Sequence, residues 1–108
     1  MLAHTPEPPY YTVIFTSVRT EVNEGYADTA ARMVELAAGQ PGFLGVESAR
    51  NDVGITVSYW ANLEAIRNWK HQAEHTLARH QGRKNWYQCF KTRICLVERD
   101  YSFERQPE

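Results

Sequence analysis

The chain has 108 residues, which is enough for one domain and too few for two. With 12 basic and 13 acidic residues the net charge is -1, so there is no basic excess of the kind that nucleic-acid binding requires. No apolar run approaches the roughly 20 residues that cross a bilayer, and the prolines near the start predict a flexible, extended N-terminal arm over residues 1–9 rather than a signal peptide. We therefore expect neither a nucleic-acid partner nor a membrane partner.

The first half of the chain predicts a strand, a helix and a strand pair. Residues 10–20 (YYTVIFTSVRT) are rich in β-branched and aromatic residues, which is typical of a strand. The following segment has apolar residues at helical spacing between Asn23, a candidate N-cap, and Gly39, a helix stop. Residues 43–50 (FLGVESAR) and 55–60 (ITVSYW) flank a short turn and predict a β-hairpin.

The second half predicts one more helix and one long strand. Asn62 is a good N-cap for a helix that continues to about Lys84, with a bend near Lys70. Residues 86–101 are expected to be extended as the last strand. Residues 104–108 are expected to form a frayed tail.

Cys89 and Cys95 both fall in the predicted last strand. Their separation along a strand is about 20 Å, which is too long for a disulfide between them. Two reduced thiols are typical of a cytoplasmic protein, so we expect a cytoplasmic location. A disulfide between two subunits is the alternative.

The predicted order is β-α-β-β-α-β over residues 10–103, an α+β, ferredoxin-like fold with a four-stranded antiparallel sheet. Both helices must then cover one face of the sheet. The first strand is nevertheless apolar on both sides, with Val13 and Phe15 on one and Ile14 and Val18 on the other. A second copy of the chain would cover the remaining face, which predicts a homodimeric α+β barrel.

Three stretches resemble the antibiotic biosynthesis monooxygenase (ABM) domain family: QPGFLGVES, ITVSYWANLEAIRNWKHQAEH and WYQCFKTRICLVERDY. The resemblance runs from about Tyr11 to Tyr101. It implies a ferredoxin-like fold that dimerises into an α+β barrel, with a pocket between the helices and the sheet in each subunit. Characterised members include cofactor-free oxygenases of polycyclic phenols, quinol oxygenases and haem-degrading enzymes.

The resemblance also implies a site. Trp69 matches the helix tryptophan that lines the family's pocket, and His75 follows six residues later, where phenol-oxidising members place a tyrosine. On this basis His75 is the predicted base, Trp69 the stacking platform and Tyr59 a hydrogen-bond donor, for oxidation of a phenol or quinol by O2 without a cofactor. The predicted substrate-binding residues are Phe15, Ile66 and Arg93.

Two other functions remain open. Haem-degrading members carry an asparagine near the end of the first strand, where this chain has Thr16, Ser17, Val18 and Arg19, and an axial histidine for which His80 is the nearest candidate. Haem is therefore an alternative cofactor, bound through His80. The other possibility is a non-catalytic dimer that binds a small apolar molecule.

The stretch HQAEH, from His71 to His75, matches the H-x-x-E-H pattern of inverted zinc peptidases. Such enzymes need a third ligand from another helix and a substrate cleft, and the predicted topology supplies neither. We therefore predict no metal site beyond a weak, adventitious one, because a pattern with two free positions is easily met by accident.

Overall fold

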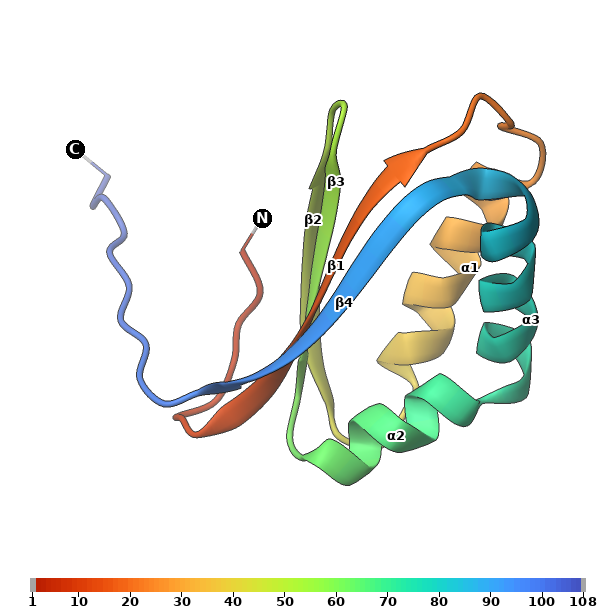
Figure 1. The fold of residues 1–108 in the computed structure, drawn as a ribbon. Helices are drawn as coiled ribbons and strands as arrows, with labels where there is room; N and C mark the ends of the chain where they lie inside the picture. The colour runs from red at the N-terminus through yellow and green to blue at the C-terminus, as the bar shows by residue number, and fades with distance from the viewer. Residues whose placement is uncertain (1, 108) are drawn as a thin grey trace.

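The computed structural model describes residues 2–107, except for the side chain of Ala73, as a four-stranded antiparallel sheet with helices on one face (Figure 1). In chain order the elements are β1 (Tyr10–Arg19), α1 (Tyr26–Ala38), β2 (Phe43–Arg50), β3 (Gly54–Trp60), α2 (Leu63–His71), α3 (Ala73–Gln81), the π-helical turn η1 (Gly82–Trp86) and β4 (Tyr87–Val97). The strand order is β2-β3-β1-β4, so the predicted α+β, ferredoxin-like fold is confirmed.

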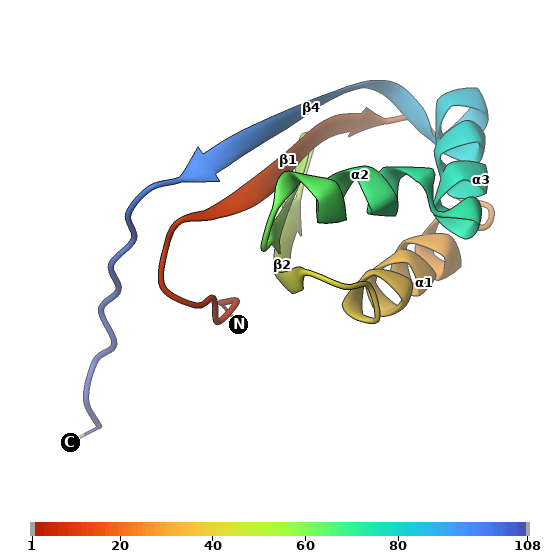
Figure 2. The same cartoon turned by 90° about the horizontal axis from the view of Figure 1, so that it is seen from below.

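The molecule has two layers. Seen from below, α1, α2 and α3 all lie on one side of the sheet, and none of them crosses to the other (Figure 2). The predicted hairpin is confirmed, since β2 pairs antiparallel with β3 along its length. We call the two surfaces of the sheet the helix face and the outer face.

The core lies where the helix face meets α1 and α2. Trp60, at the end of β3, is 0% exposed, and its ring centroid lies 5.3 Å from that of Phe43 and 6.1 Å from that of Trp69. Ile66 and Ala37 are buried against it from α2 and α1. This core holds the last turn of α1 and the first turn of α2 against one end of the sheet.

The start of α1 differs from the expected cap. Gly25, and not Asn23, is the N-cap, and it adopts the left-handed conformation with φ 77°. Asn23 contributes through its backbone carbonyl, which accepts the amide hydrogen of Tyr26 at 3.0 Å. A turn with positive φ favours glycine, so the side-chain cap that the sequence predicted is replaced by a glycine turn.

The predicted second helix is broken in two. Its N-cap is confirmed, because Asn62 Oδ1 accepts the amide hydrogen of Ala65 at 2.8 Å. The bend predicted near Lys70 is instead a complete break at Gln72, which is extended with ψ 133°. The side chain of Gln72 then caps α3 by accepting the amide hydrogen of His75 at 2.8 Å. The two ends of the HQAEH pattern therefore lie on different helices.

The last strand is shorter than predicted. β4 runs from Tyr87 to Val97, whereas residues 86–101 were expected to be extended, and Trp86 belongs to η1. Val97 pairs with Tyr10, the first residue of β1, so the chain beyond it has no strand of its own subunit to pair with. Residues 98–107 leave the sheet and run apart from the body (Figure 1).

The N-terminal arm contacts the outer face. The amide of Ala3 donates to Glu47 Oε2 at 2.9 Å, and the Thr5 hydroxyl donates to the Tyr10 hydroxyl at 2.9 Å. The mobility predicted for this arm stays a prediction. Met1 and Glu108, the ends of the predicted arm and tail, lie outside the described residues.

Cys89 and Cys95 are free thiols, as their separation along β4 predicted. Within the part of the chain that the structure describes, no helix combines the length and the apolar character that a bilayer crossing demands.

Candidate functional site

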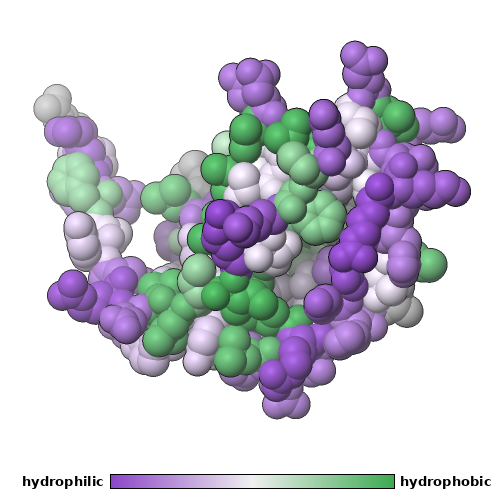
Figure 3. Space-filling view, in the orientation of Figure 1, coloured by the Kyte–Doolittle hydropathy of each residue, from purple (hydrophilic) through white to green (hydrophobic). Residues whose placement is uncertain are grey.

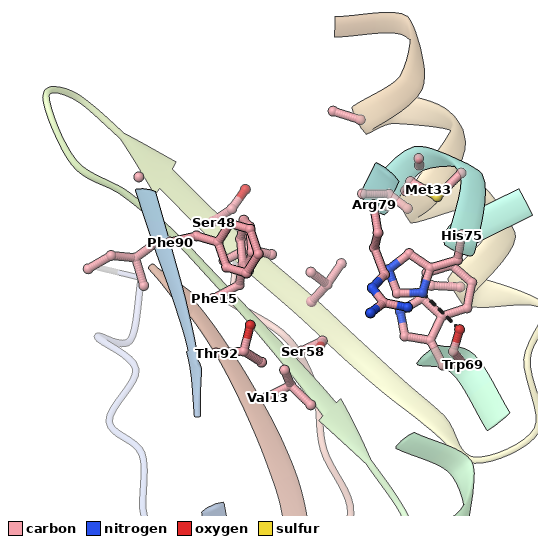
Figure 4. Close-up of a pocket in the computed structure, with 18 of the residues that line it drawn as sticks. Val13, Phe15, Met33, Ser48, Ser58, Trp69, His75, Arg79, Phe90 and Thr92 are labelled. Carbon is pink, nitrogen blue, oxygen red and sulfur yellow. Dashed lines mark hydrogen bonds between the residues drawn. The ribbon is translucent and has the colours of Figure 1, made fainter. Parts of the chain in front are cut away.

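A cavity of about 670 Å³ lies between the helix face and the three helices (Figure 4). Its floor is formed by alternate residues of β1, β3 and β4, among them Val13, Phe15, Ser58 and Thr92. Its roof comes from α1, α2 and α3, with Met33 contributed by α1. The wall is largely apolar, which suits an aromatic ligand.

The roof carries a stack of aromatic rings. The imidazole of His75 lies parallel to the Trp69 ring, with 4.1 Å between the centroids and 10° between the planes. On the core side the Trp69 ring stacks on Trp60 at 6.1 Å. The break at Gln72 produces this arrangement, because it turns the chain so that the first turn of α3 lies back over the end of α2. A packed core tryptophan thereby fixes the orientation of a histidine that faces the cavity.

Hydrogen bonding selects one tautomer of His75. Its Nδ1 lies 2.8 Å from the backbone carbonyl of Trp69 (Figure 4). A carbonyl oxygen only accepts, so Nδ1 carries the hydrogen and Nε2 holds the free lone pair. No hydrogen-bond partner is found for Nε2 among residues 2–107. Every buried side-chain nitrogen or oxygen in these residues has a partner, so Nε2 is not a buried atom. We infer that Nε2 is open to the cavity.

The protonation of His75 follows from its surroundings. Burial lowers the pKa of His75 below its ordinary 6.5, the bond to the Trp69 carbonyl partly opposes this, and the cation of Arg79 lowers the pKa further. The imidazole is therefore neutral at pH 7. A neutral imidazole with a free Nε2 is a general base.

The wall also carries positive charge. Arg50, Lys70, Arg79 and Arg83 line the cavity, and none of the described lining residues is Asp or Glu. We did not predict these four residues from the sequence. Arg79 could have been predicted from its spacing, because it lies four residues after His75 on one helix and such residues share a face. The others gave no local signal.

Two tyrosines and two phenylalanines line the end of the cavity near β4. The Phe15 ring lies 5.3 Å from the rings of both Tyr87 and Phe90. Burial, and then the neighbouring hydroxyl of Tyr26, raise the pKa of Tyr87. Tyr87 thus keeps its hydrogen and is a hydrogen-bond donor, which the sequence did not single out.

The structure brings four of the predicted site residues together. Phe15, Ile66, Trp69 and His75 all line the cavity. They come from β1, α2 and α3, so their convergence depends on how the helices pack on the sheet.

Two predicted residues lie on the outer face instead. Tyr59 precedes Trp60 in β3, and successive strand residues point to opposite faces, so Tyr59 points away from the cavity. Arg93 pairs with Ile14, between Val13 and Phe15 in register, and points outward for the same reason. The structure therefore does not place Tyr59 or Arg93 where a ligand of the cavity could touch them.

Tyr59 takes part in a hydrogen-bond network on the outer face. Its hydroxyl donates to Glu47 Oε1 at 2.5 Å. Burial, and then the Glu47 carboxylate, raise the pKa of Tyr59 to about 12. The same bond lowers the pKa of Glu47. Tyr59 thus keeps its hydrogen and donates it to an ionised Glu47 carboxylate.

His80 does not line the cavity, and the HQAEH pattern is divided between α2 and α3. His80 is exposed on α3 and, five residues after His75, is turned about 140° from it around the helix. It does not offer an axial ligand to a haem in the cavity. Glu74 accepts from Arg32 Nε at 2.7 Å, and no cluster of three metal-ligating side chains occurs among residues 2–107.

Comparison with known proteins gives two kinds of match. The sequence profile of the antibiotic biosynthesis monooxygenase family matches residues 9–81. The uncharacterized protein YqjZ of Bacillus subtilis (strain 168) is 53% identical over 105 residues, which cover 95% of this chain and 92% of that protein.

Solved structures share the fold at low sequence identity. SnoaB, a cofactor-independent oxygenase from Streptomyces nogalater, superposes with a TM-score of 0.65 at 16% identity, covering 94% of this chain and 100% of SnoaB. Rv0793 from Mycobacterium tuberculosis superposes with a TM-score of 0.76 at 8% identity, covering 86% of this chain and 99% of Rv0793. At such identities these structures support the fold alone.

Proposed function

The chain belongs to the antibiotic biosynthesis monooxygenase family, and from this premise we propose that it is a cofactor-independent monooxygenase that oxidises a small electron-rich aromatic, a phenol or quinol, with O2. The observation that carries the proposal is the stack of His75 on Trp69, with Nδ1 bound to a carbonyl and Nε2 open to an apolar cavity. SnoaB, which shares the fold, is a cofactor-independent oxygenase.

In the proposed reaction His75 starts the chemistry and Trp69 orients the ring. Nε2 takes the proton of the phenol, and the apolar wall raises the energy of the resulting anion relative to water. The phenolate then passes one electron to O2. Arg79 lies beside the imidazole and its charge stabilises the phenolate oxygen.

The atoms and electrons balance without an external reductant. The phenoxyl radical and superoxide join at a ring carbon, and the imidazolium protonates the peroxide. Cleavage of the O–O bond with loss of the ring hydrogen then releases water. One oxygen atom enters as the second quinone carbonyl, the other leaves as water, and the substrate supplies all the electrons.

The test is oxygen consumption with a panel of naphthols and quinols, comparing the wild-type chain with His75→Gln. Loss of a general base lowers turnover by about 100-fold or more, and we expect a change of this size. Arg67→Gln on α2, an exposed residue, is the control for handling and folding. Ligand binding without oxygen uptake by the wild type would refute the enzyme and leave a non-catalytic binder.

We also propose that the chain forms a homodimer through the outer face and the C-terminal segment. Tyr101 is 100% exposed and Phe103 is 81% exposed on that segment, which stands apart from the body (Figure 3). Ile55 on the outer face is also exposed. Large apolar side chains rarely stay fully in water, so a second copy of the chain is the expected cover.

Sedimentation at low micromolar concentration tests the dimer. We expect twice the chain mass, and dissociation on replacing Tyr101 and Phe103 by Ser. Leu77→Ser is the matched control, because Leu77 is 69% exposed on α3, away from the outer face. A folded single subunit for the wild type would show that the dimer is wrong. The cytoplasmic location stays a prediction.

A further inference from the structure

Among the described residues that line the cavity, none supplies a negative charge to balance the positive ones. Four cationic side chains line it without an acidic one among the described lining residues, although the whole chain has a net charge of -1. The carboxylates found in ion pairs within residues 2–107 both bind Arg32, which is exposed on α1. The cavity is therefore locally positive in a nearly neutral protein.

Two of these cations lie at the same end of the sheet, the end that carries Ser17. Arg50 reaches across from β2 and donates through Nη1 to the Ser17 carbonyl at 3.4 Å, and through Nη2 to the Ser17 hydroxyl. Phe90 is the partner of Ser17 in β4. The guanidinium carbon of Arg83 lies 5.7 Å from the Phe90 ring centroid. The two arginines thus lie at a pair of residues, Ser17 and Phe90, that face each other on neighbouring strands.

The position of Arg50 is built into the sheet. Gly54 pairs with Ser17 in β3, and a Cβ on Gly54 would lie 2.1 Å from the Arg50 guanidinium carbon. Only a glycine leaves room for the guanidinium to lie against the strand. Its two bonds to Ser17 fix the head group and leave further N–H donors of the five unused.

Arg83 has its donors unused as well. Within residues 2–107 its guanidinium makes no hydrogen bond or ion pair and contacts the ring of Phe90. One guanidinium is fixed at Ser17, and the other lies over Phe90, the partner of Ser17 in β4, with its donors unused. Such groups suit a carboxylate, because planar N–H donors match its two oxygens.

We propose that Arg50 and Arg83 form a site for a carboxylate, so that the substrate is an aromatic acid with its oxidisable ring held at Trp69 and His75. The proposal deepens the proposed function and rests on it for the identity of the reacting ring. From His75 to Arg83 the backbone of α3 and η1 rises by about 12 Å, since a helix rises about 1.5 Å per residue. A substrate with two fused rings and its acid opposite its hydroxyl suits this span.

The test is isothermal titration calorimetry with 6-hydroxy-2-naphthoate and its methyl ester, which differ in charge at one end. For the wild type we expect the acid to bind about tenfold tighter than the ester or more, as for one charge-assisted contact. High salt should weaken the binding of the acid and leave the binding of the ester unchanged. Arg83→Gln should remove most of the difference and leave the ester unchanged.

Arg93→Gln is the matched control, because it removes the same charge from β4 on the outer face. Arg50→Lys is the second variant, which keeps the charge but loses the planar fork, and it should weaken the acid by less than Arg83→Gln does. Equal binding of acid and ester by the wild type would overturn the proposal. Equal weakening by Arg83→Gln and Arg93→Gln would overturn it too, as would no binding of the acid.

The same two compounds separate this proposal from the proposed function. If the acid binds through Arg83 but the protein consumes no O2 with it, the proposed monooxygenase activity is wrong for this compound and the carboxylate site stands. If acid and ester bind equally and both are oxidised through His75, the anion site is wrong and the monooxygenase stands.

Discussion

The two faces of the sheet are built from the same strands and have opposite chemistry. The helix face lines a cavity that also contains a neutral imidazole and cationic side chains, with no Asp or Glu among the described lining residues. On the outer face, Tyr59 and Tyr10 donate to the carboxylates of Glu47 and Asp100, each at 2.5 Å. The outer groups satisfy one another, whereas those of the cavity are left for a ligand.

This difference shows how far one position in a strand matters. Tyr59 and Trp60 are neighbours in the chain, and both are wide aromatic residues that a pocket could use. Trp60 is buried in the core that supports the site, and Tyr59 hydrogen-bonds on the other side of the sheet. Because strand side chains alternate, a shift of one residue moves an aromatic side chain from the core beneath the cavity to the opposite face of the sheet.

The largest expected effect concerns the core beneath the site. Trp60→Ala should lower the free energy of unfolding by about 3–5 kcal/mol, since it removes a fully buried ring that contacts Phe43 and Trp69. Urea denaturation measures this. Val57→Ala, in the same strand but on the outer face, should cost less. Equal losses would show that the two faces are packed alike.

The next effect is the pH dependence of the helix face. Because the pKa of His75 is lowered from 6.5, the proposed base stays neutral until the pH falls below that value. Turnover should then fall about tenfold per pH unit, and His75→Gln should abolish this limb. The unfolded chain binds the proton more readily, so the free energy of unfolding should also fall as the pH drops below 6.5. An acid limb that His75→Gln leaves intact would contradict the assignment.

A smaller effect is expected on the outer face. Glu47→Gln replaces a carboxylate that accepts from Tyr59 and from the Ala3 amide, and should cost about 0.5–1 kcal/mol of stability. The pKa of Glu47 is lowered, so its contribution is present above its ordinary pKa of 4.5 and lost as the pH falls through the lowered value. Wild type and variant should therefore have similar stability in acid, and a difference that persists there would argue against this bond.

The smallest expected effect tests most directly whether the outer face is separate from the reaction in the cavity. Tyr59→Phe removes a hydroxyl from the outer face, and turnover should stay within about twofold of the wild type, as for changes away from the site. A steady-state assay with the best substrate of the phenol panel measures it. A large loss of turnover with Tyr59→Phe would mean that the outer face takes part in the reaction.

Local patterns in the sequence determined the order of the elements. Apolar spacing places α1, β2 and β3 within a residue or two of their observed bounds, and Asn62 caps α2 as expected. The spacing of Trp69 and His75, read through the family resemblance, predicted the pair that meets in the cavity. Such signals survive because each depends on neighbours in the chain, which propensity and periodicity describe.

Tertiary structure alone decided the rest of the site. The end of β4 depends on where β1 begins, and the roles of Tyr59 and Arg93 depend on which face the helices cover. Arg50 and Arg83 are 33 residues apart in the numbering and line one cavity only because β2, β3, β1 and β4 are brought into one sheet. Contacts between distant residues form when the chain packs, and no local pattern encodes them.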